Sequence, residues 1–571
     1  MCDIDIENIN LHKKKDYSEI TWNNLIIEFQ NNYNSFETRK DIIIFQKKLQ
    51  KLYKVTVSNC DLIKIYNYLE LNNIKIKNLI TKKKQKSNSG VLVITVLTSA
   101  HPEYIDDDGN IKIAKFSCKH DCAYCPNEKG HEGNNWVDQP RSYLFQEPAV
   151  LRANVNNFDA IKQMNARLST LMDMGHSLDK LEIIILGGTW SEYPEQYKER
   201  FITEIYYAVN IFNNIYKRDI LTLEKEIELN QNESQIHIIG LTLETRPDTI
   251  TLEEIKKFRK YNCTRIQLGV QHTNNDVLQK INRGHNIECV YDAIKLLKEN
   301  CYKIDIHLMP NLPGSSYEKD VEMLNDSLYD PRIQVDQYKI YPTAIVPWTK
   351  IKKWYEDGTY IPYDDLKLYE LIKNFKKKVQ KWKRLNRIIR DIPSSYISGG
   401  YDKKYVNMRQ LLQNDMKKYN WECKCIRCRE VGNNIVNFDD IKLHIEEYSA
   451  SDGKEYFISY ETNKYLIGFI RLRINSINPN VLPVLKNAAL IRELHIYSNL
   501  NNVGNNINDS MQHKGFGKRL VKEAELIAIK NGYYKIAIIS GTGVRNYYKK
   551  LGYELEETYM IKYLKYKCII Q

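Results

Sequence analysis

Three cysteines, Cys118, Cys122 and Cys125, lie within eight positions of one another. This Cys-x3-Cys-x2-Cys spacing, with Tyr124 directly before the third cysteine, lets one short loop bind three irons of a [4Fe-4S] cluster. Clusters that only transfer electrons normally have four thiolate ligands, so a fourth iron without one is available to chelate a small molecule. The alternative is a zinc site with a distant fourth ligand. Two histidines are candidates for that ligand, His120 and His131.

The cysteine loop and a later glycine pair together resemble the radical S-adenosylmethionine (SAM) enzymes. Gly187-Gly188-Thr189 follows the apolar run 181–186, and such a pair is by itself usually a turn. In radical SAM enzymes the open iron binds the amino and carboxylate groups of SAM, and one electron cleaves SAM to a 5′-deoxyadenosyl radical. The resemblance implies that Gly187, Gly188 and Thr189 bind the methionine amino group through the backbone.

A second cofactor motif is Gln512-His513-Lys514-Gly515-Phe516-Gly517, before a helix expected from Lys518. Backbone N–H groups at a glycine-rich helix start bind pyrophosphate, although a lone match is more often a turn. Q-x-x-G-x-G between strands ALIRELHIY and KIAIIS, followed by NYYKKLGY, resembles the acetyl-CoA loop of GNAT acetyltransferases. There the preceding strand splays from its neighbour and pairs with pantetheine, and a tyrosine reaches the thioester sulfur. The matching residues are Glu493, Leu494, His495, Ile496 and Tyr548, which we prefer to Tyr547.

A second cysteine group, Cys423-x-Cys425-x2-Cys428, has the spacing of a short metal knuckle. Zinc is the expected ion, with His444 or another nearby histidine as fourth ligand. The alternative is a set of unpaired structural cysteines. Because the group lies between two expected domains, we interpret it as a structural clamp.

Short apolar segments alternate with helical ones in the middle of the chain. Such alternation predicts a parallel sheet with covering helices, closed or partly closed as a barrel. Ligands of these folds bind at the carboxyl ends of the strands, where we expect all the short motifs to lie. The expected strands are 91–97, 181–188, 236–244, 265–271, 303–310 and 334–342.

The predicted fold class is therefore α/β, with a partial (β/α) radical SAM barrel, a C-terminal GNAT α+β domain and a basic helical N-terminal region. The expected regions are a tRNA-binding region at 1–86, the radical SAM domain at 87–400, a zinc-binding linker at 401–437 and the GNAT domain at 438–571.

Composition narrows the class of protein further. An apolar fraction of 43% in 571 residues excludes a disordered chain. The net charge is +13, and basic runs lie at 12–15, 81–86 and 374–384, the last of which contains Trp382. A single basic run is often only a solvated surface, but several runs in one basic chain favour a nucleic-acid partner. Neither a membrane span nor a signal peptide is apparent, so we expect a cytoplasmic protein with reduced cysteines. The final Cys568-Ile569-Ile570-Gln571 matches the prenylation pattern, which arises easily by chance.

Longer stretches from about residue 87 to 563 resemble, in order and spacing, the catalytic subunit of Elongator, a tRNA-modifying radical SAM acetyltransferase family. They are GHSLDKLEIIILGGTW, LTLETRPD, CTRIQLGVQ, NRGH, HLMPNLPG, KIYPT, RDIP, REVG, IRELHIY, QHKGFG and ISGTGVRNYYKKLGY.

The resemblance implies an enzyme that installs a carboxymethyl group on carbon 5 of the wobble uridine of tRNA. The radical would abstract hydrogen from the acetyl-CoA methyl, the carbon radical would add to the base, and hydrolysis of the thioester would leave the carboxymethyl group. Other Elongator subunits or a second copy are implied partners, and the electron donor is not specified. The implied acetyl-CoA contacts are Lys180, Glu493–Ile496, Phe516, Gly517, Lys518 and Tyr548, and the implied chamber residues are Lys339, Tyr341 and Arg390.

One departure from the family lies next to the cysteines, where Asn127-Glu128 replaces the usual Gly-Gly. Two other functions remain open. One is a protein lysine acetyltransferase with a structural iron–sulfur domain, whose base would be Glu493 or His495. The other is a non-catalytic tRNA-binding scaffold.

Overall fold

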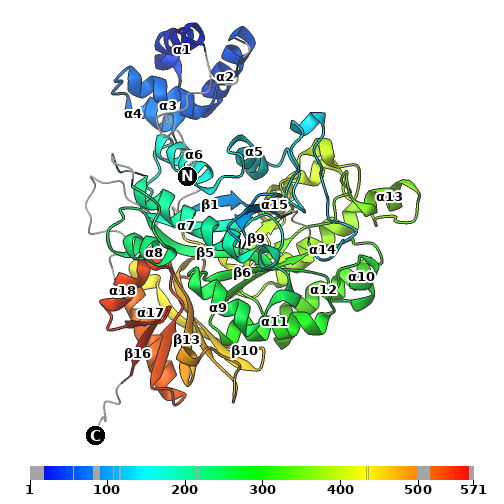
Figure 1. Ribbon diagram of the computed structural model, residues 1–571, viewed down its shortest axis with the longest axis vertical. Helices are drawn as coiled ribbons and strands as arrows, with labels where there is room; N and C mark the ends of the chain where they lie inside the picture. The colour runs from blue at the N-terminus through cyan, green and yellow to red at the C-terminus, as the bar shows by residue number, and fades with distance from the viewer. Residues whose placement is uncertain are drawn as a thin grey trace.

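The structure is a computed structural model with three parts (Figure 1). A group of short helices stands above a large body, whose parallel sheet we call the barrel sheet, and a second sheet, the C-terminal sheet, lies below it. The described residues are 18–53, 55, 57–81, 90–106, 108–114, 118–212, 214, 218–432, 434, 436–497 and 515–564.

The barrel sheet has seven parallel strands in the order β1-β4-β5-β6-β7-β8-β9. Each strand pairs with the next strand of the same sheet along the chain, as in Leu92 opposite Leu181 and Asp305 opposite Gln337. This order confirms the predicted partial barrel. The strands are β1 (Leu92–Leu97), β4 (Lys180–Leu186), β5 (His237–Thr245), β6 (Arg265–Gln271), β7 (Lys303–Leu308), β8 (Gln337–Ile340) and β9 (Arg384–Ile388).

Helices connect consecutive strands and cover the outer face of this sheet, as parallel pairing requires (Figure 1). α11 is typical: the Asn286 side chain caps its start, and Val290, Ile294 and Leu297 bury one face. The helices of the body are α5 (Pro148–Val155), α6 (Ala160–Asp173), α7 (Glu195–Ile211), α8 (Leu223–Asn232), α9 (Leu252–Lys260), α10 (Asn275–Lys280), α11 (Ile287–Glu299), α12 (Tyr317–Tyr329), α13 (Lys350–Glu356), α14 (Asp365–Lys378), α15 (Met408–Lys418) and α16 (Ile426–Arg429).

The two faces of the barrel sheet differ in polarity. In β6 the residues Ile266, Leu268 and Val270 lie in the apolar core, whereas Arg265 and Gln267, which alternate with them, line an internal cavity. Side chains alternate between the faces of a strand, so the barrel sheet is apolar toward its helices and polar toward its lumen.

Two elements of the body were not predicted. A short hairpin, β2 (Glu103–Ile105) with β3 (Ile111–Ile113), precedes the cysteine loop, and β9 completes the barrel sheet.

The interpretation of 374–384 as a nucleic-acid surface is wrong for three of its members. Lys376 and Lys383 are fully buried, and Trp382 stacks on Tyr448 with ring centroids 4.6 Å apart.

The C-terminal sheet has the order β10-β11-β12-β13-β14-β16-β15, antiparallel except for β13 with β14. Helix α17 packs on it through Leu520, Val521 and Ala524, and Gly532 follows the helix in the left-handed region. The elements are β10 (Lys442–Ala450), β11 (Gly453–Glu461), β12 (Leu466–Ile474), β13 (Ala488–Ile496), α17 (Phe516–Lys530), β14 (Lys535–Ile538), α18 (Arg545–Lys549), β15 (Glu554–Glu556) and β16 (Tyr559–Tyr563).

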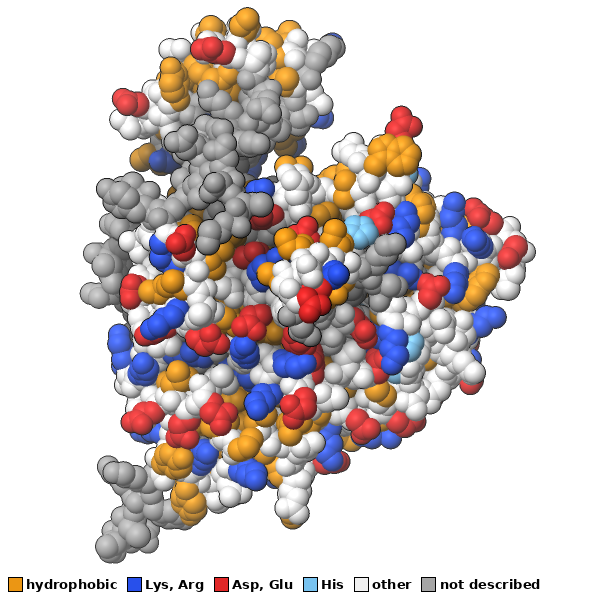
Figure 2. Space-filling model, in the orientation of Figure 1, with side chains coloured by type: hydrophobic (Ala, Val, Ile, Leu, Met, Phe, Trp, Pro, Cys, Tyr) orange, Lys and Arg blue, Asp and Glu red, His pale blue; other side chains and the backbone are white. Residues whose placement is uncertain are grey.

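The N-terminal helices form a small core of their own around Leu25, Phe29, Phe45 and Ile65. They meet the body through an ion pair between Lys64 and Asp173. Figure 2 shows basic and acidic side chains intermixed over the face of the body below them. No helix in the described part of the chain is both long and apolar enough to cross a membrane. The helices are α1 (Glu19–Asn32), α2 (Arg39–Tyr53), α3 (Asn59–Tyr68) and α4 (Ile74–Ile80).

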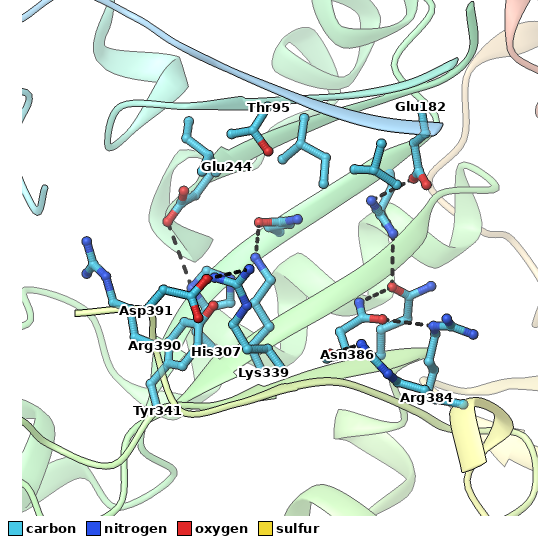
Figure 3. A pocket seen from close by; sticks show the side chains of 18 of the residues that line it. Thr95, Glu182, Glu244, His307, Lys339, Tyr341, Arg384, Asn386, Arg390 and Asp391 are labelled. Carbon is cyan, nitrogen blue, oxygen red and sulfur yellow. Dashed lines mark hydrogen bonds and ion pairs between the residues drawn. The ribbon is translucent and has the colours of Figure 1, made fainter. Parts of the chain in front are cut away.

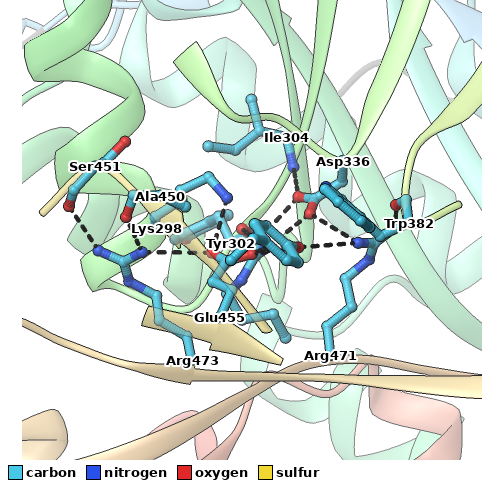
Figure 4. A network of polar contacts seen from close by, with 12 residues as sticks. Lys298, Tyr302, Ile304, Asp336, Trp382, Ala450, Ser451, Glu455, Arg471 and Arg473 are labelled. Atoms are coloured by element: carbon cyan, nitrogen blue, oxygen red, sulfur yellow. Dashed lines mark hydrogen bonds and ion pairs between the residues drawn. The ribbon is translucent and has the colours of Figure 1, made fainter. Parts of the chain in front are cut away.

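A buried ionic network joins the barrel sheet to the C-terminal sheet (Figure 4). Arg492 of β13 donates two hydrogen bonds to Asp336, at 2.9 and 2.6 Å, and a third to Glu455 at 2.8 Å. Lys298 of α11 donates to the other oxygen of Glu455 at 2.7 Å. All four side chains are shielded from solvent, so each charge depends on its partners.

We expect Asp336→Asn to destabilise the protein strongly, because Arg492 would keep its charge in a dry interface with one anion removed. The expected loss is about 3–5 kcal/mol, measured as a lower midpoint of chemical denaturation. Asp452→Asn is the matched control, because it removes an exposed ion pair with Lys295 across the same interface and should change stability by less than ~0.5 kcal/mol. Equal effects of the two substitutions would contradict this account.

Candidate active site

A cavity of about 1260 Å³ runs along the polar face of the barrel sheet (Figure 3). At one end it is lined by Tyr124 and Pro126 of the cysteine loop, and at the other by Glu493, His495 and Tyr548 of the C-terminal domain. The cavity therefore reaches from the residues beside Cys125 to part of the predicted acetyl-CoA region, but the three cysteines and Gly187, Gly188 and Thr189 are not among the residues that line it.

The cysteine loop and the Gly-Gly-Thr segment meet at the carboxyl ends of β1 and β4. The Cys118 Sγ atom lies 3.5 Å from the Thr189 Oγ1 atom. Gly187 has a φ of +139°, and a Cβ atom there would lie 1.8 Å from the Thr98 Oγ1 atom. Only glycine fits at this position, because both the backbone conformation and the approach of β1 exclude a side chain.

Two buried arginines face the Cys122 thiol. Nη1 of Arg246 lies 3.8 Å from its Sγ atom, and Nη1 of Arg283 lies 3.5 Å from it. Burial raises the pKa of Cys122, but the positive charges of Arg283 and Arg246 outweigh burial and lower it. Burial raises the pKa of the Cys125 thiol to about 11, with Cys122 adding to the effect. Cationic donors beside the thiol suit an anionic thiolate-bound cluster, so the residues fit a [4Fe-4S] group held by Cys118, Cys122 and Cys125.

Glu128, one of the residues that depart from the family pattern, organises the segment after the cysteines. Its side chain is fully buried, and its carboxylate accepts hydrogen bonds from the Phe145 backbone, Asn134 and His131 at 2.8, 3.2 and 3.1 Å. His131 is thereby committed to Glu128, and His120 lies 3.3 Å from Asp248. The two histidines considered as a fourth zinc ligand for the cysteine loop thus each face an acidic side chain, Glu128 or Asp248.

The side of the chamber that the sequence predicts for acetyl-CoA lies where β13 separates from β14. The two strands pair only from Ala488–Ile491 to Lys535–Ile538, and the cavity enters beside the following residues, Glu493, Leu494 and His495. Ile496 pairs with Gly468 of β12.

The expectation that all short motifs lie at the carboxyl ends of the barrel strands is wrong. Lys180 begins β4, and Lys303, which begins β7, donates to Glu493 at 2.9 Å. The C-terminal sheet therefore covers the amino ends of the barrel strands, opposite the cysteine loop.

The two residues considered as bases for lysine acetylation differ in charge. Burial raises the pKa of Glu493, but Lys303 and then Arg471 outweigh it and lower this pKa to about 2. Burial lowers the pKa of His495 to about 4. Glu493 is thus an ionised structural partner of two cations, and both groups are weak bases at neutral pH.

The tyrosines of α18 take different positions. Tyr548 is buried and lines the chamber, whereas Tyr547 is 36% exposed.

Gly515 precedes α17 in the left-handed region, and Phe516, Gly517 and Lys518 form its first turn, so the helix begins two residues before the predicted start. Gln512, the first residue of the predicted pyrophosphate loop, lies outside the described residues, as does the Cys568–Gln571 end.

Three predicted chamber residues line the cavity, namely Lys339, Tyr341 and Arg390 (Figure 3). Lys339 donates to the Gln267 side chain at 2.5 Å, and burial lowers the pKa of Lys339 to about 8 despite the nearby Asp305. Arg390 forms a two-pronged ion pair with Glu147, at 2.6 and 3.1 Å, and so ties the end of β9 to the segment after the cysteines.

The second cysteine group is brought together as predicted from its spacing. Among the described residues, only Cys423, Cys425 and Cys428 form a set of three potential ligands with donor atoms within 4.8 Å of one another, and they can hold a metal ion. The fourth neighbour is the buried Lys376, whose Nζ atom lies 3.2 Å from the Cys428 Sγ atom. His444 lies on β10, opposite Ser459, and is not a member of the set.

Sequence reasoning missed several residues that shape the site. Arg246 and Arg283 stand in the segments LTLETRPD and NRGH, which carried the family resemblance without assigned roles. Gln271, at the end of β6, and His307, within β7, lie in two segments that were read only as apolar strands. The signal that could have found His307 is a histidine on the polar face of a strand.

Comparison with known families agrees with this geometry. The chain matches the radical SAM superfamily over residues 116–326, a radical SAM C-terminal domain over 335–418 and the GNAT acetyltransferase family over 417–553. It is 36% identical to the tRNA uridine(34) acetyltransferase of Methanocaldococcus jannaschii, over 93% of this chain and 96% of that protein. It is 35% identical to Elongator complex protein 3 of Saccharomyces cerevisiae, over 85% and 86%.

A solved structure has a similar fold over most of this chain. Archaeal Methanocaldococcus infernus Elp3 lacking residues 1–46 superposes with a TM-score of 0.69, at 33% identity, over 83% of this chain and all of that one. The fold and the cysteine loop define a radical SAM enzyme joined to a GNAT acetyltransferase domain. The chain belongs to the Elongator catalytic-subunit family, together with Elongator complex protein 3 and the tRNA uridine(34) acetyltransferases.

We expect Cys122→Ala to lose the cluster, because this thiol is the one held between Arg246 and Arg283. Iron and acid-labile sulfide per chain, measured after anaerobic reconstitution, should fall to a small fraction of the wild-type values. Cys289→Ala is the control, since this half-buried cysteine of α11 lies outside the loop and should retain full iron. Wild-type iron content in the Cys122 variant would show that the loop is not the cluster site.

Proposed function

We propose that this chain is a tRNA-modifying acyltransferase, which uses a SAM-derived radical and acetyl-CoA to install a carboxymethyl group at C5 of the wobble uridine. The observation that carries the proposal is the single chamber between the cysteine loop and the β13–β14 opening. Related proteins named for acetyl transfer to tRNA uridine 34 support the choice of substrate.

The chain's own residues would hold the reactants at opposite ends of the chamber. Cys118, Cys122 and Cys125 would bind a [4Fe-4S] cluster, and Gly187, Gly188 and Thr189 would offer their backbone to SAM. When bound, these groups supply the organic radical and acetyl-CoA supplies the two carbons that are transferred. The remaining task of the protein is to position the reactants and exclude water, which enclosure by two sheets favours.

The acetyl-CoA end would be formed by Lys180, the β13 residues Glu493–Ile496 and the first turn of α17, with Tyr548 beside the thioester. Its electrostatics suit binding rather than proton abstraction. Glu493 is neutralised by Lys303 and Arg471, and the amino end of a 15-residue helix favours a phosphate group.

The remaining expectations stand as parts of the same proposal. Zinc would be held by Cys423, Cys425 and Cys428, with Lys376 beside them to stabilise the negative charge of the thiolates. The helices of the region 1–86, with exposed Lys40, Lys47 and Lys51 on α2, would contact tRNA phosphates. We expect a cytoplasmic enzyme that acts with further Elongator-type subunits or a second copy.

The decisive experiment is anaerobic reconstitution of the full chain with iron and sulfide, then addition of SAM, dithionite, acetyl-CoA and unmodified tRNA. The proposal predicts 5′-deoxyadenosine and a carboxymethylated wobble uridine, detected by mass spectrometry of the digested tRNA. Neither product should form in the Cys118/Cys122/Cys125 triple-alanine variant.

The same assay separates the alternative of protein lysine acetylation. A protein substrate mixture is incubated with acetyl-CoA and either the wild type or the triple-alanine variant. Equal acetyl-lysine formation by both, with no modified uridine in the tRNA assay, would refute the proposal and favour an acetyltransferase with a structural iron–sulfur domain.

A further inference from the structure

A buried arginine beside the cysteine loop has no carboxylate partner. Arg283 is 4% exposed, and within the described part of the chain no carboxylate lies within ion-pair distance of its guanidinium group. Its Nε and Nη2 atoms donate to the Gly269 carbonyl, the first at 3.2 Å, and its Nη1 atom lies 3.5 Å from Sγ of Cys122. A buried cation needs an anion beside it. The anion that this position offers is the Cys122 thiolate, or a metal group bound to it.

The second arginine at this thiol is paired with a carboxylate. Arg246 is 2% exposed, and its Nη1 atom lies 3.8 Å from Sγ of Cys122. Its Nε and Nη2 atoms donate to the two oxygens of Asp248, at 2.9 and 3.2 Å, and Nη2 also donates to the Arg283 carbonyl at 2.5 Å. Two guanidinium groups therefore face this sulfur while only one carboxylate pairs with them, so the surroundings of the sulfur are net positive.

The segment that carries Arg283 is fixed directly to the cysteine loop. The backbone N–H of Ala123 donates to the Ile281 carbonyl at 2.9 Å. The side chain of Asn282 donates to the Asp121 carbonyl at 3.1 Å. These contacts hold the guanidinium group of Arg283 at the thiol, as expected of a side chain that tunes a metal group through its ligand.

We propose that Arg246 and Arg283 set the reduction potential of the cluster on the cysteine loop, by stabilising its reduced form and so raising the potential. The inference rests on the proposed function, which places a [4Fe-4S] group on Cys118, Cys122 and Cys125. Reduction takes one electron from a one-electron donor such as dithionite and breaks no bond, so the cluster gains one negative charge. Net charge and hydrogen bonds to the sulfurs set the potential of such clusters, and buried cations act with little screening.

The test measures the midpoint potential of the full chain after anaerobic reconstitution with iron and sulfide, without SAM or tRNA, from the EPR signal of the reduced cluster. Arg283→Gln removes the charge but keeps an amide that can donate to the Gly269 carbonyl. We expect it to lower the equilibrium constant for reduction by about tenfold or more, a shift of about 59 mV toward negative potential. Arg283→Lys keeps the charge and should recover most of this shift.

Asp248→Asn should move the potential in the opposite direction. The amide has nearly the same shape as the carboxylate but no longer neutralises Arg246, so the positive charge at Cys122 increases and the potential should rise. Looser packing would admit water to the cluster in either variant and would shift both potentials the same way. The opposite signs therefore separate a charge effect from damage to the fold. If Arg283→Gln binds no cluster, the sign of the shift in Asp248→Asn decides.

Arg545→Gln is the matched control. Arg545 is also 4% exposed and has no carboxylate partner among the described residues, but it contacts Gln231 and Asn262 rather than the cysteine loop. The potential of this variant should equal that of the wild type.

An unchanged or higher potential in Arg283→Gln, or an unchanged or lower one in Asp248→Asn, would overturn the inference and leave the proposed function intact. A wild type that binds no iron after reconstitution would refute the cluster itself, and with it both the inference and the proposed function.

Discussion

The bidentate contact between Arg492 and Asp336 is the interaction on which the rest of the structure depends. It joins β13, the strand that separates from β14, to the residue that precedes β8 of the barrel sheet. Asp336 also accepts a hydrogen bond from the backbone of Ile304 in β7, so the same carboxylate fixes two barrel strands and the C-terminal sheet. Because these charges are buried, a shift of one sheet along the other would leave a buried ion without its partner, so the two sheets meet in one register.

This fixed docking explains the form of the chamber. A parallel barrel normally offers its carboxyl ends to ligands, and the cysteine loop and the Gly-Gly-Thr segment follow that rule. The amino ends are usually closed, yet here Lys303 and Arg384 reach residues of the C-terminal domain, Glu493 and Tyr497. The lumen between them is lined by polar side chains. The barrel thus has the cysteine loop at the carboxyl ends of its strands and the C-terminal sheet at their amino ends, with a polar cavity of about 1260 Å³ along its inner face.

Much of the fold follows from the sequence, because short apolar strands alternate with helical segments, the pattern of a parallel sheet with covering helices. β9 was missed because its inward residues Arg384 and Asn386 continue a basic, helix-like stretch, and its place is decided by pairing with β8. The site was predictable where chemistry is concentrated in short motifs, as in the two cysteine groups. The roles of Arg246 and Arg283 were not, since tertiary packing alone brings them to Cys122, and Glu128 became intelligible only through its contact with Phe145.

The central proposal is that both reactant sites open into one chamber. Its most direct test is the transfer of an isotope between them, with acetyl-CoA carrying a trideuterated acetyl group, under anaerobic turnover with tRNA. The account predicts that 5′-deoxyadenosine acquires one deuterium from the acetyl methyl, in an amount that matches the modified uridine formed. Modified uridine accompanied only by unlabelled 5′-deoxyadenosine would contradict it, because the radical and the acetyl group would then have reacted in separate places.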